Sequence, residues 1–243
     1  MKKTICFDFG NTRLKCGIFE NDIFVTELVL ADDTTATIEG LLQQYQPQNS
    51  ILSSVIAHNP EIETLLEAHT HFHKLSHLTK INFTTPVGKP ASIGADRLAL
   101  VAAAVHFYPN KNTLVIALGS CITYNFINQA NEFLGGAISP GLEMRFKAMH
   151  DHTAFLPLVK KEFSFPIIGY DTNTNLQSGV IAGLSFEIDG FIDYYASKYS
   201  NFNVVLTGGD AAYFATHIKN KVFADAHFLL KGLYAISEFN NRT

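Results

Sequence analysis

The sequence predicts an α/β protein that consists of two similar domains, each with a mixed sheet and flanking helices. Three consecutive apolar segments with tight turns between them open each half of the chain, and this pattern is typical of neighbouring antiparallel strands. Apolar residues at helical spacing and a further short apolar segment follow in both halves, which indicates strands connected through helices. The repetition of this order predicts a duplicated α/β domain.

In the first half, the apolar pattern predicts three strands, a helix, a strand and a second helix. These elements are expected at Thr4–Asp8, Leu14–Phe19, Ile23–Leu30, Thr34–Tyr45, Ser50–Ile56 and Pro60–Ala68. Asn21 and Asp22 are expected to form the turn between the second and third strands, and Pro47 to end the first helix.

A strongly apolar helix is expected next, at Asp96–Phe107, before a break at Pro109 and Asn110. Three strands, two helices and a last strand then follow, at Thr113–Ala117, Cys121–Asn128, Glu132–Ile138, Gly141–Met149, Leu176–Tyr199 and Asn203–Leu206. We therefore expect an N-terminal domain at residues 1–109 and a C-terminal domain at residues 110–243. In a duplicated protein of this kind, the ligand is expected between the two domains.

The composition is that of an ordinary globular protein, with 47% apolar and 16% charged residues. A net charge of −4 argues against binding to nucleic acid, which requires a basic surface. Lys2 and Lys3 lead directly into a strand, so we expect no signal peptide, and no apolar stretch has the length of a membrane span. The three cysteines stand far apart inside apolar segments, which indicates buried, reduced thiols in a cytoplasmic protein; they are Cys6, Cys16 and Cys121.

The turn of the first hairpin carries residues that suit a phosphate group. Gly10 lets backbone N–H groups approach a ligand without obstruction, and Lys15 supplies a neutralising charge. Asp8, at the end of its strand, could hold a water molecule of Mg²⁺, which takes few carboxylates. The alternative is a plain hairpin in which Gly10 and Asn11 only permit positive φ angles. The sequence contains no Walker A motif, and no G-x-G-x-x-G motif opens a helix after a strand.

A second hairpin repeats this pattern from Ala117 to Ile127, with Gly119 and Ser120 at its turn. Two such turns that face each other would clamp a phosphate chain between their backbone N–H groups and hydroxyls. The second copy has Ala117 where the first has the carboxylate of Asp8.

Three further motifs have both a functional and a structural explanation. In the segment from Gly94 to Arg97, the Asp96 carboxylate could accept a proton from an attacking hydroxyl, and Arg97 could bind an anionic substrate; alternatively, Asp96 caps the helix. The glycine-rich segments Leu134–Leu142 and Thr207–Asp210 could bring backbone close to a ligand, or could be ordinary turns.

Histidines alternate with other residues at His69, His71 and His73, so we expect the three imidazoles on one strand face. Such a face could bind Zn²⁺ or Ni²⁺ weakly, although no carboxylate or cysteine accompanies it. The alternative is an exposed polar face without a metal.

Together and in this order, the motifs resemble those of the type III pantothenate kinase family, part of the sugar-kinase, Hsp70 and actin superfamily. The residues that carry the resemblance are Asp8 to Thr12, Gly94 to Arg97, Gly119 to Thr123, Gly135 to Leu142, Thr153 to Pro157 and Thr207 to Asp210. The resemblance implies two ribonuclease-H-like (actin-like ATPase) domains. It also implies a homodimer whose interface helps to form the pantothenate pocket, and transfer of the ATP γ-phosphate to the primary hydroxyl of pantothenate, the first step towards coenzyme A.

The resemblance also implies roles for individual residues. Asp96 is expected to be the general base, and Asp8 to hold Mg²⁺ through water. The ATP-binding residues are expected to be Asp8, Phe9, Gly10, Asn11, Thr12, Arg13, Leu14, Lys15 and Ser120. The substrate-binding residues are expected to be Gly94, Ala95, Asp96, Arg97 and Thr172.

The sequence departs from the family pattern at three positions. An aspartate that ligates an activating K⁺ or NH₄⁺ in the family is Ala117 here, so this cation site is expected not to function. Val87 stands in place of a tyrosine, and Asn125 in place of an acid. Two hypotheses remain: an ATP-dependent pantothenate kinase, which the intact first loop favours, or a catalytically impaired member that binds nucleotide or pantothenate and acts through a partner.

Overall fold

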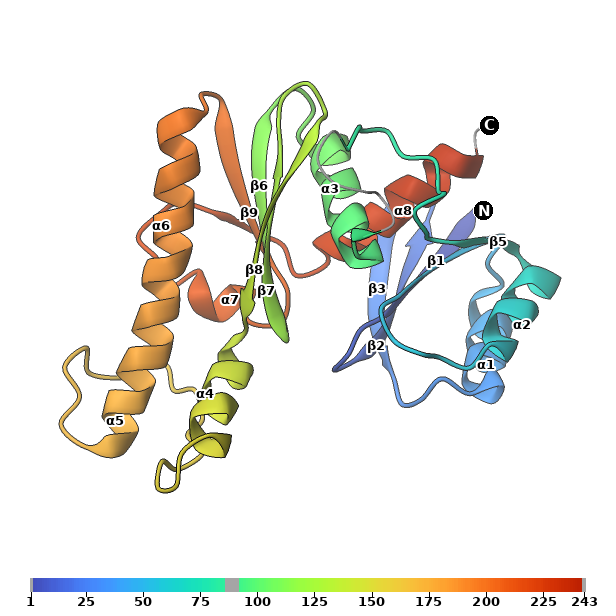
Figure 1. Cartoon of the computed structure of the whole chain (residues 1–243). Coiled ribbons are helices and arrows are strands. Elements are labelled where there is room, and N and C mark those ends of the chain that lie inside the picture. The colour runs from blue at the N-terminus through green and yellow to red at the C-terminus, as the bar shows by residue number, and fades with distance from the viewer. Residues whose placement is uncertain (1, 86–91, 242–243) are drawn as a thin grey trace. The chain divides into compact units, whose positions relative to one another are not determined.

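The computed structural model describes residues 2–85 and 92–241, which form two compact units (Figure 1). The first unit comprises Met1–Asn110, Gln129–Leu134 and His227–Thr243, and the second comprises Lys111–Asn128 and Gly135–Ala226. The predicted domains, 1–109 and 110–243, are continuous segments, whereas these units are not. The last part of the chain packs in the first unit because it forms a helix on that unit's sheet.

The first unit is built on a mixed five-stranded sheet with the strand order β3-β2-β1-β4-β5. Strands β1, β2 and β3 are antiparallel neighbours, and β4 and β5 continue the sheet in parallel to β1. The elements are β1 (Lys3–Phe9), β2 (Leu14–Glu20), β3 (Ile23–Leu30), α1 (Thr35–Tyr45), β4 (Asn49–Ser54), α2 (Glu61–His69), β5 (His71–Lys74), α3 (Ala95–Phe107) and α8 (Phe228–Asn241).

Local signals in the sequence explain where these elements begin and end. Asn21 and Asp22 adopt positive φ angles of 47° and 71°, which gives a tight turn of the twist that a hairpin needs. The side chain of Thr34 accepts a hydrogen bond from the backbone N–H of Thr37 and so caps α1. Gln46 ends that helix in the left-handed region, before Pro47.

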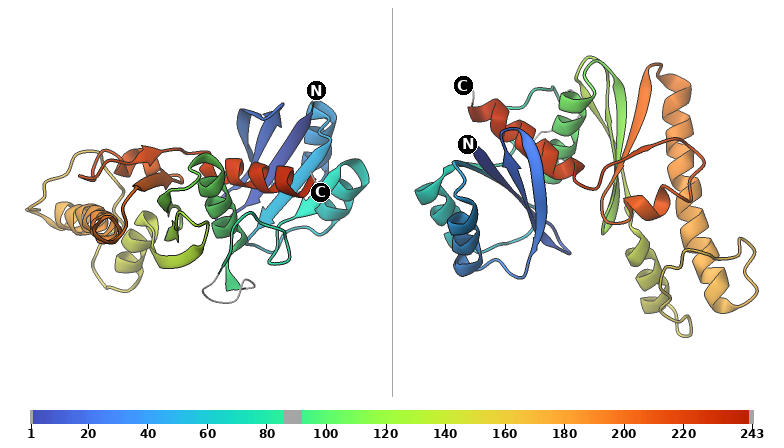
Figure 2. Two further views of the ribbon diagram at one scale, coloured as in Figure 1. Left: turned by 90° about the horizontal axis from the view of Figure 1, so that it is seen from above. Right: turned by 180° about the vertical axis from the view of Figure 1, so that it is seen from behind.

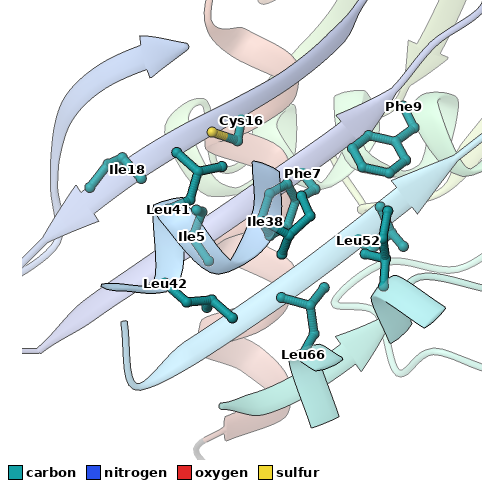
Figure 3. Packing of buried hydrophobic residues seen from close by; sticks show 11 residues of the cluster. Ile5, Phe7, Phe9, Cys16, Ile18, Ile38, Leu41, Leu42, Leu52 and Leu66 are labelled. Carbon is teal, nitrogen blue, oxygen red and sulfur yellow. The ribbon is translucent and has the colours of Figure 1, made fainter. Parts of the chain in front are cut away.

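Strand alternation gives the first sheet two different faces. One face carries Ile5, Phe7 and Phe9, which pack against apolar residues of α1 and α2 in one buried cluster (Figure 3). The other face carries Cys6, Asp8 and Gly17, and helix α8 packs on β1, β2 and β4 (Figure 2). A methyl group at Gly17 would lie 3.0 Å from the Leu230 side chain, so this glycine lets α8 approach the sheet closely.

The second unit repeats the topology of the first, with the strand order β10-β9-β6-β7-β8. Strands β6 and β7 form an antiparallel hairpin, and β9 and β10 add in parallel to β6. The elements are β6 (Asn112–Leu118), β7 (Cys121–Ile127), β8 (Phe133–Pro140), α4 (Leu142–Asp151), α5 (Thr172–Gln177), η2 (Ser178–Ala182), α6 (Gly183–Lys198), β9 (Phe202–Thr207), α7 (Ala211–Phe214) and β10 (Phe223–Ala224). The predicted duplication of an α/β domain with mixed sheets is confirmed.

Three sequence predictions need correction. The single helix expected at Leu176–Tyr199 begins earlier, as α5, and passes through the π-helical segment η2 before α6. Helix α8 was not expected from the sequence. Cys6 and Cys16 are buried as predicted, but Cys121 is exposed because it is the first residue of β7, beside the hairpin turn.

Candidate active site

The first hairpin of the chain ends in an exposed polar turn. The backbone N–H of Gly10 donates to the carbonyl of Arg13 at 3.1 Å, which closes the turn between β1 and β2. Asn11, Thr12 and Arg13 are exposed, whereas Phe9 is fully buried and anchors the end of β1 in the core. The turn thus presents polar groups from a rigid base, as the sequence predicts for this hairpin.

Asp8 is the carboxylate next to this turn, and its environment disfavours its charge. Burial, together with the negative charge of Asp96, raises the pKa of Asp8 to about 7. Lys15, directly opposite Asp8 in the antiparallel register, opposes this shift, and Glu27 adds to it. The first unit therefore brings Asp8 and Lys15 of the first hairpin near Asp96, which is far from them in the sequence. The negative charges of Asp8 and Asp96 favour a positively charged group beside them.

Glu27 on β3 connects two side chains, Lys15 and His227, to this cluster. One of its carboxylate oxygens lies 2.9 Å from Nζ of Lys15, and the other lies 3.1 Å from Nδ1 of His227. Burial alone would raise the pKa of Glu27, but hydrogen bonds from Lys15 and His227 outweigh burial and hold the pKa below its ordinary value. Glu27 is thus ionised at neutral pH.

Asp96 and Arg97 lie in the first turn of α3. The cap position is Gly94 and not Asp96, and Gly94 has no side chain with which to cap the helix. A methyl group at Gly94 would meet Oδ1 of Asp96 at 2.5 Å, so the carboxylate is folded back over the helix start. Burial raises the pKa of Asp96, while the backbone N–H and charge of Arg97 oppose the shift. A carboxylate with a raised pKa accepts a proton more readily, as a general base must.

Arg97 is held by an aromatic ring. Its guanidinium lies 5.5 Å from the centroid of the Phe133 ring, and Phe133 in turn packs edge-on against Phe83. The backbone of Phe133 donates to the carbonyl of Thr84, which fixes residues 129–134 in the first unit. This stacking orients a charged group that could bind an anionic substrate.

The second hairpin turn lies between β6 and β7 and is surrounded by backbone. Gly119 donates to the carbonyl of Cys121 at 3.1 Å within the turn, and Ser120 is exposed. Gly141 donates to the carbonyl of Ser120 at 3.1 Å, and Asp210 donates to the carbonyl of Leu118 at 3.2 Å. Two glycine-rich segments singled out in the sequence therefore meet at the same turn.

Glycines are required where these segments meet. A methyl group at Gly141 would lie 2.2 Å from the carbonyl oxygen of Gly119, and one at Gly208 would lie 2.4 Å from that of Leu118. Gly208 also has a φ of +93°, which other residues rarely adopt. Asp210, which follows, forms an ion pair with Lys161. Gly208 in the segment Thr207–Asp210 is thus explained by close backbone packing around the turn, whereas nothing lies within 4 Å of a methyl group at Gly209.

Ala117 lies in β6, opposite Thr123 on β7 and Thr207 on β9. Its methyl group supplies no oxygen to a cation. Asn125 is buried and donates to the carbonyl of Val115 at 3.3 Å, which gives this departure from the family a structural role. Val87 lies outside the described residues.

Thr172 is the exposed first residue of α5 in the second unit. The preceding Asp171 caps this helix, with its side chain accepting from the backbone N–H of Thr174 at 2.8 Å. The capping box is a local reason for the helix to begin here, and it leaves the Thr172 side chain available to a ligand. Ser120 and Thr172 belong to the second unit, whereas Asp8, Asp96 and Arg97 belong to the first.

The expected histidine face on one strand is wrong. His69 ends α2, where its Nδ1 contacts the carbonyl of Leu65 at 2.9 Å, so only His71 and His73 lie in β5. His73 Nε2 is engaged by the hydroxyl of Thr79 at 2.9 Å. Within residues 2–85 and 92–241, no group of three or more His, Cys, Asp or Glu side chains could hold a metal ion. In the same ranges, no helix combines the length and apolarity that a membrane crossing requires.

Sequence reasoning missed Glu27 and His227 as members of the charged cluster. An acidic residue inside the apolar strand Ile23–Leu30 is the signal that could have drawn attention to Glu27. His227 has no comparable signal, since it becomes a neighbour of β3 only when α8 packs on the first sheet.

Comparison with known proteins identifies the family. The model of the type III pantothenate kinase family matches residues 4–194. A type III pantothenate kinase of Christiangramia forsetii is 40% identical over 238 residues, covering 97% of this chain and 98% of the relative. One of Bacteroides fragilis is 36% identical over 247 residues and covers 98% of both chains.

Solved structures show the fold. A conserved protein of the Baf family from Campylobacter jejuni superimposes with a TM-score of 0.64 at 20% identity, covering 98% of this chain and all of the other. The activator of 2-hydroxyisocaproyl-CoA dehydratase from Clostridium difficile, solved with bound ADPNP, gives a TM-score of 0.53 at 12% identity, with 99% and 96% coverage. The two units are thus ribonuclease-H-like domains of the actin-like ATPase type, and the chain belongs to the type III pantothenate kinase family.

Proposed function

We propose that this chain phosphorylates pantothenate with ATP to give 4'-phosphopantothenate, the first step of coenzyme A biosynthesis. The observation that carries this proposal is the cluster of Asp8, Lys15 and Asp96 beside an exposed glycine turn. Phosphoryl transfer passes through a loose transition state, so positioned charges supply most of the catalysis. Family membership over nearly the whole chain supports the choice of substrate.

ATP is proposed to bind at the two hairpin turns. In the first, the residues from Asp8 to Lys15 offer backbone N–H groups, the hydroxyl of Thr12 and the ammonium of Lys15. In the second, the exposed residue Ser120 is proposed to contact the nucleotide through its hydroxyl. The charge of Lys15 offsets the negative charge that accumulates on the phosphoryl oxygens.

Asp96 is proposed to be the general base. The primary hydroxyl oxygen of pantothenate attacks the γ-phosphorus, the bond from that phosphorus to the bridging oxygen breaks, and ADP leaves. The proton of the hydroxyl passes to the Asp96 carboxylate, whose raised pKa suits a proton acceptor. Arg97 and Thr172 are proposed to bind pantothenate, together with Gly94 and Ala95.

Asp8 is proposed to hold Mg²⁺ through water. Oxygen donors of the Asp8 type fit this ion, which is usually bound by one or two carboxylates together with substrate phosphates. When bound, Mg²⁺ neutralises charge on the β- and γ-phosphates. The negative charges of Asp96 and Glu27 near Asp8 give the site a negative potential that favours a cation. At Ala117 no side-chain oxygen is present, so we expect activity without dependence on K⁺ or NH₄⁺.

A homodimer is proposed on the basis of an apolar surface on the second unit. The segment between α4 and α5 exposes large side chains, namely Phe155, Leu158, Phe163, Ile167, Ile168 and Tyr170. Phe155 is 96% exposed and Ile168 is 83% exposed, which is unusual for a protein that remains a monomer. A second copy of the chain would cover these residues and bring Thr172 close to the same interface.

A coupled assay of ADP formation tests the proposal. Wild-type protein with ATP, Mg²⁺ and pantothenate should turn over, and the rate should not respond to K⁺. Asp96→Asn should lower kcat by a factor of about 10² to 10⁴, the usual contribution of a positioned base, while calorimetry shows unchanged binding of an ATP analogue. Failure of the wild type to form ADP in a pantothenate-dependent manner would refute the proposal.

A further inference from the structure

Glu27 is placed so that it competes with Asp8 for one lysine. In the antiparallel register, Lys15 stands opposite Asp8 on β1 and opposite Val29 on β3. Glu27, two residues before Val29, is the diagonal neighbour of Lys15 on the same face of the sheet. Lys15 therefore has two carboxylates within reach, one on each side.

Of these two carboxylates, Glu27 is the one that pairs with Lys15, at 2.9 Å. The pair is largely shielded, since the Lys15 and Glu27 side chains are 23% and 18% exposed. A shielded, charge-assisted hydrogen bond is stronger than the surface pairs that contribute little to stability. The position of the Lys15 ammonium is thus set by Glu27.

Glu27 also forms a hydrogen bond with a second side chain, that of His227. Its second oxygen lies 3.1 Å from Nδ1 of His227, and a carboxylate only accepts, so His227 donates this bond. The His227 ring stacks on Phe24 of the same strand, with 4.6 Å between ring centroids. His227 is the residue at which the chain re-enters the first unit, just before α8. Both carboxylate oxygens of Glu27 are therefore fixed.

We propose that Glu27 is a positioning residue that holds Lys15 away from Asp8 and so leaves Asp8 available to Mg²⁺. This inference rests on the proposed function, because it assigns Asp8 to the metal and Lys15 to the phosphates. Without the negative charge of Glu27, the Lys15 ammonium would pair with its directly opposite neighbour Asp8. Mg²⁺ would then compete with Lys15 for one carboxylate, and the phosphates would lose a neutralising charge.

The Glu27→Gln variant tests this inference through its Mg²⁺ dependence. The Mg²⁺ concentration for half-maximal activity and the KM for ATP should each rise about tenfold, while kcat at saturating Mg²⁺ and ATP changes much less. Glu27→Asp, which keeps the charge, should recover most of the loss. A matched control is Glu20→Gln, which removes a similar pair in the same sheet, that of Glu20 on β2 with Lys3 on β1 at 3.1 Å. This control should leave the Mg²⁺ dependence unchanged.

A double-mutant cycle shows whether Glu27 acts through Lys15. Calorimetry with a non-hydrolysable ATP analogue and Mg²⁺ gives a dissociation constant for each variant. In the Lys15→Met background, Glu27→Gln should have little further effect on this constant, because there is no ammonium left to position. Thermal unfolding of each variant separates this effect from a loss of folding.

The outcomes distinguish this inference from the proposed function. If the wild type phosphorylates pantothenate but Glu27→Gln shows the Mg²⁺ dependence of Glu20→Gln, the inference is wrong and the function stands. The inference is also wrong, while the function stands, if Glu27→Gln still weakens binding of the ATP analogue in the Lys15→Met background. If the wild type neither binds the analogue nor turns over, both are refuted.

Discussion

Asp8 on β1 and Asp96 on α3 lie close enough that the negative charge of Asp96 raises the pKa of Asp8. Burial makes the larger contribution, and together they bring this pKa to about 7. The folded protein without metal therefore stores unfavourable electrostatic energy at Asp8 in neutral solution. Sites that are arranged for chemistry commonly carry such a cost in stability.

The first prediction concerns Asp8→Asn and pH. Because folding raises the pKa of Asp8, the carboxyl group stabilises the folded state below pH 4, and this contribution is lost as the pH rises to about 7. Relative to the wild type, Asp8→Asn should therefore become more stable by up to about 1.4 kcal/mol per pH unit across this window. Urea unfolding in EDTA at pH 5 and pH 8 measures the difference. The exposed Asp151, changed to Asn, is the control, and an equal pH response of both variants would contradict the prediction.

The second prediction compares two adjacent glycines. Gly208→Ala should destabilise the protein by about 2 kcal/mol or more, because alanine is strained at a φ of +93° and its methyl group would overlap the Leu118 carbonyl. Gly209→Ala should change stability by less than about 0.5 kcal/mol, since nothing lies within 4 Å of an added methyl group there. Thermal unfolding checks both, and similar effects of the two changes would count against the described packing.

The third prediction restores a carboxylate to the second hairpin. Ala117→Asp should make turnover respond to K⁺, because the new side chain offers a negatively charged carboxylate ligand at the end of β6. Ala117→Asn keeps the size but not the charge and should remain insensitive. Initial rates in K⁺ and in a large organic cation at equal ionic strength provide the test. Potassium stimulation already present in the wild type would show that another group supplies the ligand.

The fourth prediction concerns the apolar surface between α4 and α5. Ile168→Asp should convert a dimer to a monomer, since a charge at an interface core is costly to bury. Leu78→Asp, at a residue of the first unit that is 80% exposed, should leave the oligomeric state unchanged. Light scattering after gel filtration measures both masses. A wild type that is already a monomer would refute the proposed homodimer.

The hairpins could be predicted from the sequence because their signals are local. Alternation from Leu14 to Phe19 and the pair Asn21-Asp22 specify strand and turn without any distant partner. The His69 prediction failed for a related reason. Alternation of histidines alone does not distinguish the last residue of a helix from the first residues of a strand.

The long-range parts of the site could not be predicted in this way. The pairing of Lys15 with Glu27 depends on the register between β2 and β3. The contact of His227 with Glu27 depends on where α8 packs. Gly141 and Gly208 could be recognised as turn residues, but not as contacts of the same hairpin. Helix α8 is largely buried because α3 and the first sheet both cover it, and these contacts join segments that are far apart in the sequence.

The return of α8 to the first sheet has a consequence for biosynthesis. Nascent chains generally fold domain by domain from the N-terminus, but here the first unit lacks one of its covering helices until residues 228–241 have been made. Gly17 and the part of that sheet face which α8 covers remain exposed while the second unit is being translated. A ribosome-bound intermediate with an exposed sheet face is therefore expected, and it is a natural substrate for chaperones.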